Sequence, residues 1–271
     1  MSDPLQELTK ALELLGHQLG EPVVVNKAAR NVYRFVNVFE DEDQASERSA
    51  AIHPSALADC LRKASMEFEG IPRLNTAIPP NVMRAGRVGK ILHGMIQRSF
   101  ARTAKRSGVF KYRAEVPLTK DMPDVERLCL AGSGDSVLEY KNWRIGHEIK
   151  GLGESEYASL STTREKDLLQ ASVYQHCLQL DAVWFIYISR RSYEERHVVV
   201  KIPDSYWDAM RRRASTVLGH KMAGNMPPGT DDSYSCGACA YAPACPHPRN
   251  KAVPLTEVLK CAERAKTNPG V

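Results

Sequence analysis

The hydrophobic residues of this chain recur with two periods, which divide it into expected helices and strands. The longest amphipathic stretch spans 82–106, where an apolar stripe would run along one side of a helix. This stripe comprises Val88, Ile91, Leu92, Met95, Ile96 and Phe100. Further helices are expected over 4–19, from Pro54 through Leu57, Leu61 and Ala64, over 164–180 and 204–222, and in a short C-terminal segment.

Strand-like segments occupy the stretches between these helices. They are expected at 112–117, 127–131, 135–140, 143–150, 183–189 and 194–201. Turn signals, Gly132-Ser133-Gly134 and Lys141-Asn142, separate the middle ones. A helix, several antiparallel strands, a helix, a strand pair and a helix together predict an α/β fold with a mixed central β-sheet flanked by helices.

The chain is expected to divide into three parts. Residues 1–50 would form an N-terminal extension with a helix, a β-like run (23–25) and an acidic stretch (40–48). Residues 51–225 would form the core, and residues 226–271 a cysteine-containing C-terminal segment. The chain has no internal repeat and no Walker-type phosphate-binding loop, so it encodes no ATP-driven motor of that kind.

The composition is that of an ordinary globular protein. The 271 residues are 43% hydrophobic, which is enough for a sizeable core. No apolar run has the length of a membrane span, and the N-terminus lacks the basic-then-apolar order of a secretory signal. We therefore expect an intracellular protein, in the host cytoplasm if a phage encodes it, with no membrane partner.

Basic side chains gather in two places, although the net charge of +5 does not by itself demand a nucleic-acid partner. The larger group comprises Arg84, Arg87, Lys90, Arg98, Arg102, Lys105, Arg106, Lys111 and Arg113. The smaller group is the run Arg211, Arg212 and Arg213. Each group is compatible with a solvated helix face, and the larger one is also a candidate for binding a nucleic-acid backbone.

Two acidic residues and a lysine are expected to meet at one end of the sheet. Asp135 opens one expected strand, and Glu148-Ile149-Lys150 closes the next. Because side chains alternate along a strand, Glu148 and Lys150 project to the same face, while Ile149 faces the core with its carbonyl free to reach a cation. A hairpin between the strands would bring Asp135 alongside Glu148. Two carboxylates can hold Mg²⁺ or Mn²⁺ for phosphodiester hydrolysis, with the lysine orienting or deprotonating the attacking water.

The E-x-K triplet alone is a weak signal, because an exposed ion pair on a strand explains it equally well. Further observations strengthen it. His93 follows Gly89 by four residues on the long helix. Gln170 and Tyr174 are also four apart, so they share a helix face. Taken singly, His93 is compatible with a solvated histidine and Tyr174 with a core aromatic residue.

The ordered set G-x-x-x-H, G-x-x-D, E-x-K and Q-x-x-x-Y, within residues 53–246, resembles the RecB-like branch of the PD-(D/E)XK nuclease superfamily. The resemblance implies a restriction-endonuclease-like core and a metal-dependent DNA exonuclease. The catalytic residues that it implies are Asp135, Glu148, Lys150, Gln170 and Tyr174, and the metal ligands are His93, Asp135, Glu148 and the carbonyl of Ile149. A histidine ligand moves the preference of such a site from Mg²⁺ toward Mn²⁺.

Seven cysteines are present, and an odd number without a secretion signal argues against a disulfide framework. Cys236, Cys239 and Cys245 lie within ten residues, and Cys60 is the candidate for a fourth metal ligand. A zinc ribbon usually has two C-x-x-C pairs, so one pair and a distant cysteine fit it poorly. The remaining three, Cys129, Cys177 and Cys261, are expected to be bystanders.

This cysteine pattern resembles that of the iron–sulfur nucleases, namely the AddB-type helicase–nucleases and the CRISPR-associated exonucleases of the Cas-four type. The resemblance implies a structural 4Fe–4S cluster, held by Cys60, Cys236, Cys239 and Cys245 in a subdomain that both chain ends form. Zinc is the alternative metal. Joining distant parts of the chain would restrict the unfolded state, as a disulfide does, and would help to shape a channel for one DNA strand.

The resemblance also implies the substrate, which would be single-stranded or frayed DNA ends cut exonucleolytically. The process would be replication, repair, recombination or CRISPR adaptation, and the protein would be bacterial or phage-encoded; an oligomer is compatible with the sequence. Arg87 and Lys90, beside His93, would bind the backbone in a salt-sensitive way. Tyr174 would also contact the DNA, and with Gln170 it would position the scissile strand or the lysine. Tyr112 would either stack on bases or belong to the core.

Two alternatives of other classes stay open. One is a non-catalytic DNA-end-binding or adaptor protein on the same fold, although both carboxylates and the lysine are present. The other is a zinc-stabilised nucleic-acid-binding protein in which the E-x-K triplet is coincidental.

Overall fold

The structure, a computed structural model, describes residues 50–73, 80–230, 236–246 and 249–267. The predicted N-terminal helix, the β-like run and the acidic stretch therefore lie outside the described residues. None of the described helices is long and apolar enough to cross a bilayer.

A five-stranded sheet in the order β1-β2-β3-β4-β5 forms the centre of the molecule. Its strands are β1 (Lys111–Pro117), β2 (Ser133–Tyr140), β3 (Trp143–Leu152), β4 (Ala182–Ser189) and β5 (Glu195–Val200). β3 and β4 run parallel, while all other neighbours are antiparallel. The prediction of a mixed central sheet flanked by helices is thus confirmed.

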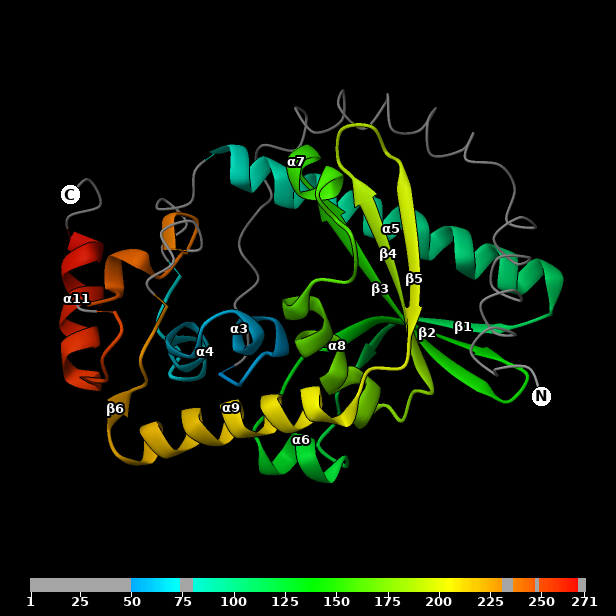
Figure 1. Ribbon diagram of the computed structural model, residues 1–271. Helices are drawn as coiled ribbons and strands as arrows, with labels where there is room; N and C mark the ends of the chain where they lie inside the picture. The colour runs from blue at the N-terminus through cyan, green and yellow to red at the C-terminus, as the bar shows by residue number, and fades with distance from the viewer. Residues whose placement is uncertain (1–49, 74–79, 231–235, 247–248, 268–271) are drawn as a thin grey trace.

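Every residue of β4 is buried, because helices cover both faces of the sheet at this strand. The long helix α5 (Pro80–Ser107) packs its apolar stripe on one face, against Ile149 and Trp184 among others. On the opposite face lie α7 (Glu154–Ala158) and α8 (Glu165–Cys177), which contact Phe185 and Tyr187. Figure 1 shows α5 and α8 on opposite sides of the strands.

The helices near the start of the described chain join this second layer. α3 (Pro54–Asp59) and α9 (Asp204–Met222) share one hydrophobic cluster with α8. α4 (Leu61–Phe68) contributes Ala64 to the same cluster and also reaches the C-terminal part through Met66. That part contains the strand pair β6 (Asn225–Met226) and β7 (Val253–Pro254), a 3₁₀ turn (Ala242–Ala244) and α11 (Leu255–Thr267). The start and the end of the described chain therefore share one hydrophobic cluster, and Figure 1 shows α4 and α11 on the same side of the molecule with the segment around the 3₁₀ turn between them.

Two predictions about local structure were wrong. Residues 127–131 are not a strand: Pro123 starts the short helix α6 (Pro123–Arg127), Cys129 has a positive φ of 51°, and only an isolated bridge joins Leu130 to Ile52. The helix expected from Pro54 to Ala64 is interrupted at Cys60, whose backbone is extended with φ −143° and ψ 126°. The sequence also did not reveal α7.

Candidate active site and cysteine site

The register of the hairpin β2–β3 places the two predicted carboxylates side by side. Ser136 pairs with His147, so the preceding Asp135 lies opposite Glu148 on the sheet face that α8 covers. The Asp135 carboxylate accepts a hydrogen bond of 2.7 Å from the backbone N–H of Ile149. This bond links β2 to β3 at the point where the Asp135 and Glu148 side chains would bind a cation.

His93 reaches the same place from the helix on the other face. Its Nδ1 lies 3.6 Å from Oδ2 of Asp135, and its ring also hydrogen-bonds the backbone of Ile149. Burial lowers the pKa of His93, although the Ile149 backbone and Glu148 oppose that effect. The imidazole is therefore neutral near pH 7, which is the form that binds metals.

Lys150 lies between β3 and α8. Its Nζ is 2.6 Å from Oε1 of Glu148 and donates a hydrogen bond of 2.9 Å to Oε1 of Gln170. The structure thus brings five of the predicted residues, together with the backbone of Ile149, to one end of the sheet. These five are Asp135, Glu148 and Lys150 from the β2–β3 hairpin, Gln170 from α8 and His93 from α5.

Tyr174 lies at the start of β2, on the α8 side of the sheet, and its predicted catalytic and DNA-binding roles stay predictions. It is buried one turn after Gln170, and its ring packs against Gly134. A Cβ atom added to Gly132 would lie 3.2 Å from the Tyr174 hydroxyl. Because Gly132 also has a φ of +150°, glycine is required at this entrance to β2. Tyr174 therefore packs at the mouth of the strand that carries Asp135.

Burial disfavours two adjacent negative charges in this site. It raises the pKa of Asp135 to about 6 and that of Glu148 to about 7, and Asp135 adds to the effect on Glu148 while Lys150 opposes both shifts. Burial also acts to lower the pKa of Lys150, but the carboxylates of Glu148, Asp167 and Asp135 outweigh it and raise that pKa. Lys150 is therefore a cation in the metal-free protein. Its single positive charge does not offset the cost of burying two ionised carboxylates side by side.

The metal-free protein is expected to lose stability as the pH rises toward neutrality. Both carboxyl groups have a higher pKa in the folded state than their ordinary values of 3.8 and 4.5, so the folded state binds their protons more tightly. This stabilisation is complete below those values and is lost as the pH rises through about 6 and about 7. Lys150, His93, Glu115 and Asp167 also face these groups and set the size of the effect.

Thermal unfolding in EDTA between about pH 4 and pH 8 measures this trend. Adding Mn²⁺ should reverse it near neutrality, because a bound cation favours both ionised carboxylates. The double variant Asp135→Asn/Glu148→Gln should lose most of the pH dependence. An identical slope in that variant would contradict the prediction.

Three polar residues beside the site were not identified from the sequence. Gln97 donates hydrogen bonds of 2.8 Å to both the backbone carbonyl of Asp135 and Oε1 of Glu115, and Ser133 donates one of 2.9 Å to Oε2 of Glu115. Glu115 has a positive φ of 49° in β1, a conformation that non-glycine residues rarely adopt. Only Gln97 had a usable signal, because it follows His93 by four residues on the same helix face.

Another unpredicted carboxylate, Asp167, lies one helical turn before Gln170. It is buried, accepts a hydrogen bond of 3.0 Å from the Tyr187 hydroxyl and forms an ion pair of 2.6 Å with Arg164. Tyr187 pairs with Lys150 across β3 and β4. This network therefore supports the wall of the site behind the lysine.

Some of the clustered basic residues lie at the surface, whereas others hold the fold together. Lys90 is exposed and Arg87 half-buried on the turns of α5 that precede His93. Arg213 donates a 2.7 Å hydrogen bond to the carbonyl of Leu57, so the run 211–213 does not form one open basic surface. Tyr112 stacks on Phe100 at a ring distance of 5.6 Å, which supports a core role rather than base stacking.

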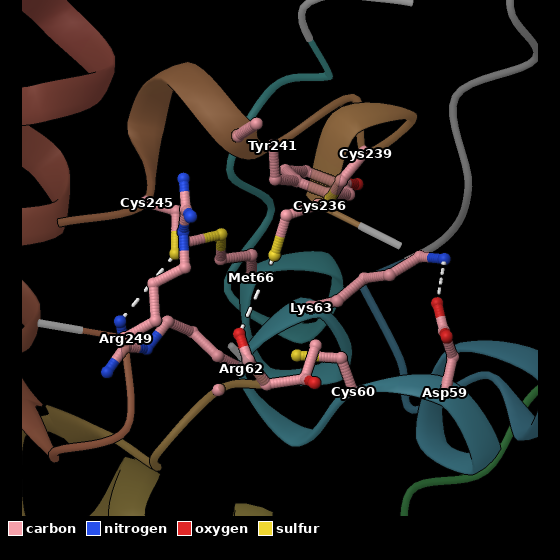
Figure 2. Close-up of a pocket in the computed structure, with 13 residues that line it drawn as sticks. Asp59, Cys60, Arg62, Lys63, Met66, Cys236, Cys239, Tyr241, Cys245 and Arg249 are labelled. Carbon is pink, nitrogen blue, oxygen red and sulfur yellow. Dashed lines mark hydrogen bonds and ion pairs between the residues drawn. The ribbon is translucent and has the colours of Figure 1, made fainter. Parts of the chain in front are cut away.

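A second candidate site lies where α4 meets the C-terminal part. One pocket is lined by the thiols of Cys60, Cys236, Cys239 and Cys245, so the structure brings all four predicted cysteines together (Figure 2). Burial raises the pKa of Cys236 and of Cys239, and the neighbouring thiols contribute to both shifts. Within the described residues, however, no three His, Cys, Asp or Glu side chains are arranged tightly enough to hold a metal ion, at either site.

The side chain of Arg62 lines this second site and links α4 to the C-terminal part. Its side chain is 1% exposed and donates hydrogen bonds to the carbonyl oxygens of Pro227, Pro246 and Lys251. It also contacts Sγ of Cys245 at 3.6 Å. The residue two positions after Cys60 therefore fastens the C-terminal cysteine segment to α4.

Comparison with known proteins shows only distant likeness. No family model and no curated protein matches this chain. The crystal structure of SSO0001 has a TM-score of 0.48 and 14% identity, over 81% of this chain and 97% of that one. LHK-Exo, an alkaline exonuclease from Laribacter hongkongensis, has a TM-score of 0.41 and 12% identity, over 65% of this chain and 90% of its own. LHK-Exo in complex with dAMP has the same TM-score and 14% identity, over 64% and 89%.

The fold and the site together define an α/β protein with a mixed five-stranded sheet, whose β2–β3 hairpin carries a cluster of ionisable groups. Similarities of this size do not assign a family to the chain. Any functional assignment therefore rests on the geometry of this chain's own residues.

Proposed function

We propose that this protein is a divalent-metal-dependent deoxyribonuclease that hydrolyses phosphodiester bonds at single-stranded or frayed DNA ends. The observation that carries the proposal is the meeting of Asp135, Glu148 and Lys150 with His93. Residues 51–225 would be the nuclease core. Residues 226–271, with Cys60, would be the metal-binding segment.

The donor set fits a divalent cation in its chemistry. Asp135, Glu148, the Ile149 carbonyl and a neutral His93 would hold Mn²⁺ or Mg²⁺, and the two crowded carboxylates lack the positive charge that the cation would bring. When bound, the cation would polarise the phosphate and lower the pKa of a water molecule.

The protein's own groups would then orient the reaction. Lys150, held by Glu148 and Gln170, points its ammonium group into the site and would stabilise negative charge on the phosphate. Its raised pKa supports this electrostatic role over that of a general base. The N–H of Ile149 keeps Asp135 oriented toward Glu148.

The DNA backbone would approach along α5. Lys90 and Arg87 lie one and two turns before His93, where their charges would attract phosphates in a sequence-independent and salt-sensitive manner. Tyr174, which packs beside Gly132, would shape the entrance to β2 next to Asp135.

The four thiols would hold a structural 4Fe–4S cluster, with zinc as the competing occupant. Their chemistry fits either metal, since four thiolates around one pocket suit both. The buried cation Arg62 at Cys245 is consistent with an anionic site there. Anaerobic purification distinguishes the two, because an iron–sulfur protein is brown and a zinc protein is colourless.

Lys150→Ala is expected to reduce cleavage on the order of 10²–10⁴-fold, because it removes the ammonium group that lies 2.6 Å from the Glu148 carboxylate. The measurement is degradation of end-labelled single-stranded DNA with Mn²⁺. Lys166→Ala, an exposed lysine on α8, is the matched control and should cleave like the wild type. Equal degradation by the wild type and Lys150→Ala would remove the active-site assignment.

A further inference from the structure

Arg62 carries a charge in a place where burial makes a lone charge costly. Its guanidinium is among the largest fully buried side chains, and its partners are three neutral carbonyl oxygens and the sulfur of Cys245. No ion pair to it is formed among the described residues. Buried cations usually require an anion nearby, and a thiolate at Cys245 would supply one.

A second arginine in the same pocket has an unmet hydrogen-bonding group. Arg249 lines the pocket with the four thiols, and its buried Nε has no hydrogen-bond partner within the described part of the chain. Its charge acts on Cys236, the first cysteine of the C-x-x-C pair. Figure 2 shows Arg62 and Arg249 on the side of the pocket where Cys245 lies.

We infer that Arg62 and Arg249 are positioning residues of the cysteine site, whose N–H groups hydrogen-bond its sulfur atoms and whose charges favour the more negative state of a bound metal centre. This inference rests on the proposed metal at the four cysteines. Hydrogen bonds to sulfur and nearby charge are among the factors that set the potential of a thiolate-bound cluster. The two residues should therefore affect both how tightly the metal is held and how readily a cluster accepts one electron.

The structure predicts different consequences for the two arginines. Arg62 also binds the carbonyls of Pro227, Pro246 and Lys251, so its loss should loosen the segment that carries Cys245. Lysine at position 62 would keep the charge but could not donate along several directions at once. Arg249 is only half-buried, and its loss should leave the fold intact while removing a charge beside Cys236.

The test compares Arg62→Lys, Arg249→Met and the wild type as full-length, metal-loaded proteins, with Arg212→Met, an exposed arginine of α9, as control. The first readout is the rate at which a chelator removes iron or zinc. The second, for an iron-loaded protein, is the midpoint potential in a dithionite titration with mediator dyes. Arg62→Lys should lose metal about tenfold faster, and Arg249→Met should shift the ratio of reduced to oxidised cluster about tenfold toward oxidised, or roughly 59 mV.

The outcomes test the roles of Arg62 and Arg249 separately from the presence of a metal at the four cysteines. A loaded wild type whose variants release metal at the wild-type rate and keep its potential would overturn the roles of the arginines but not the metal site. If the site holds zinc, release rates alone decide, and Arg249→Met should then also release faster than Arg212→Met. A wild type that takes up neither iron nor zinc on anaerobic reconstitution would overturn the metal site and this inference together.

Discussion

Glu148→Gln is expected to abolish cleavage while the protein stays folded. Glutamine has nearly the same volume, but it cannot supply the negative charge that a divalent cation needs beside Asp135. The loss should be on the order of 10³-fold or more, as for removal of a central electrostatic group. Asp135→Ala and Glu148→Ala should have the same effect on cleavage. Cleavage of labelled single-stranded DNA with Mn²⁺ measures it.

A second measurement distinguishes lost chemistry from lost folding. Mn²⁺ should raise the Tm of the wild type near neutral pH, but it should raise that of Glu148→Gln far less, because part of the binding site is gone. Glu165→Gln, at an exposed position in the first turn of α8, is the matched control for charge removal. Full activity in Glu148→Gln would show that the reaction does not use this site. Unchanged stabilisation by Mn²⁺ would show that Glu148 is not a ligand.

Cys60→Ser is expected to cause the largest loss of stability of any single cysteine substitution. In the proposed site Cys60 would be the ligand from the segment between α3 and α4, whereas the other three would come from residues 236–245. By analogy with a disulfide that closes a long loop, losing this connection should lower the free energy of unfolding by roughly 4–5 kcal/mol. Urea unfolding of the metal-loaded proteins measures the difference.

The matched control is Cys261→Ser on α11, a cysteine outside the pocket. It should retain both the metal and the wild-type unfolding curve. If Cys60→Ser keeps its full metal content and an unchanged unfolding midpoint, the connection between the two ends of the chain does not exist. If it loses metal but not stability, the metal is present without a mechanical role.

The carboxylate pair and the lysine could be predicted because each depends on a local rule. Strand alternation places Glu148 and Lys150 on one face, and a short hairpin aligns Asp135 with Glu148. Helical spacing likewise identified the face of α8 that carries Gln170. These positions follow from neighbours close in sequence.

The remaining features depend on contacts between distant segments. How closely His93 approaches Asp135 is set by where α5 crosses the sheet, which no local pattern specifies. Glu115 enters the site through a backbone conformation that its sequence neighbourhood does not favour. The apolar run at 127–131 looked like a strand, but the helix begun at Pro123 and the left-handed turn at Cys129 override that preference.

The order of the four cysteines along the chain determines when their proposed metal centre can form during synthesis. Cys60 leaves the ribosome well before Cys245, because all five strands of the central sheet lie between them in the sequence. The sheet and its helices can therefore assemble before a four-thiol centre can be filled. Insertion of the metal would then follow the folding of the sheet, and the proposed centre would fill only after the segment that carries Cys236, Cys239 and Cys245 has been synthesised.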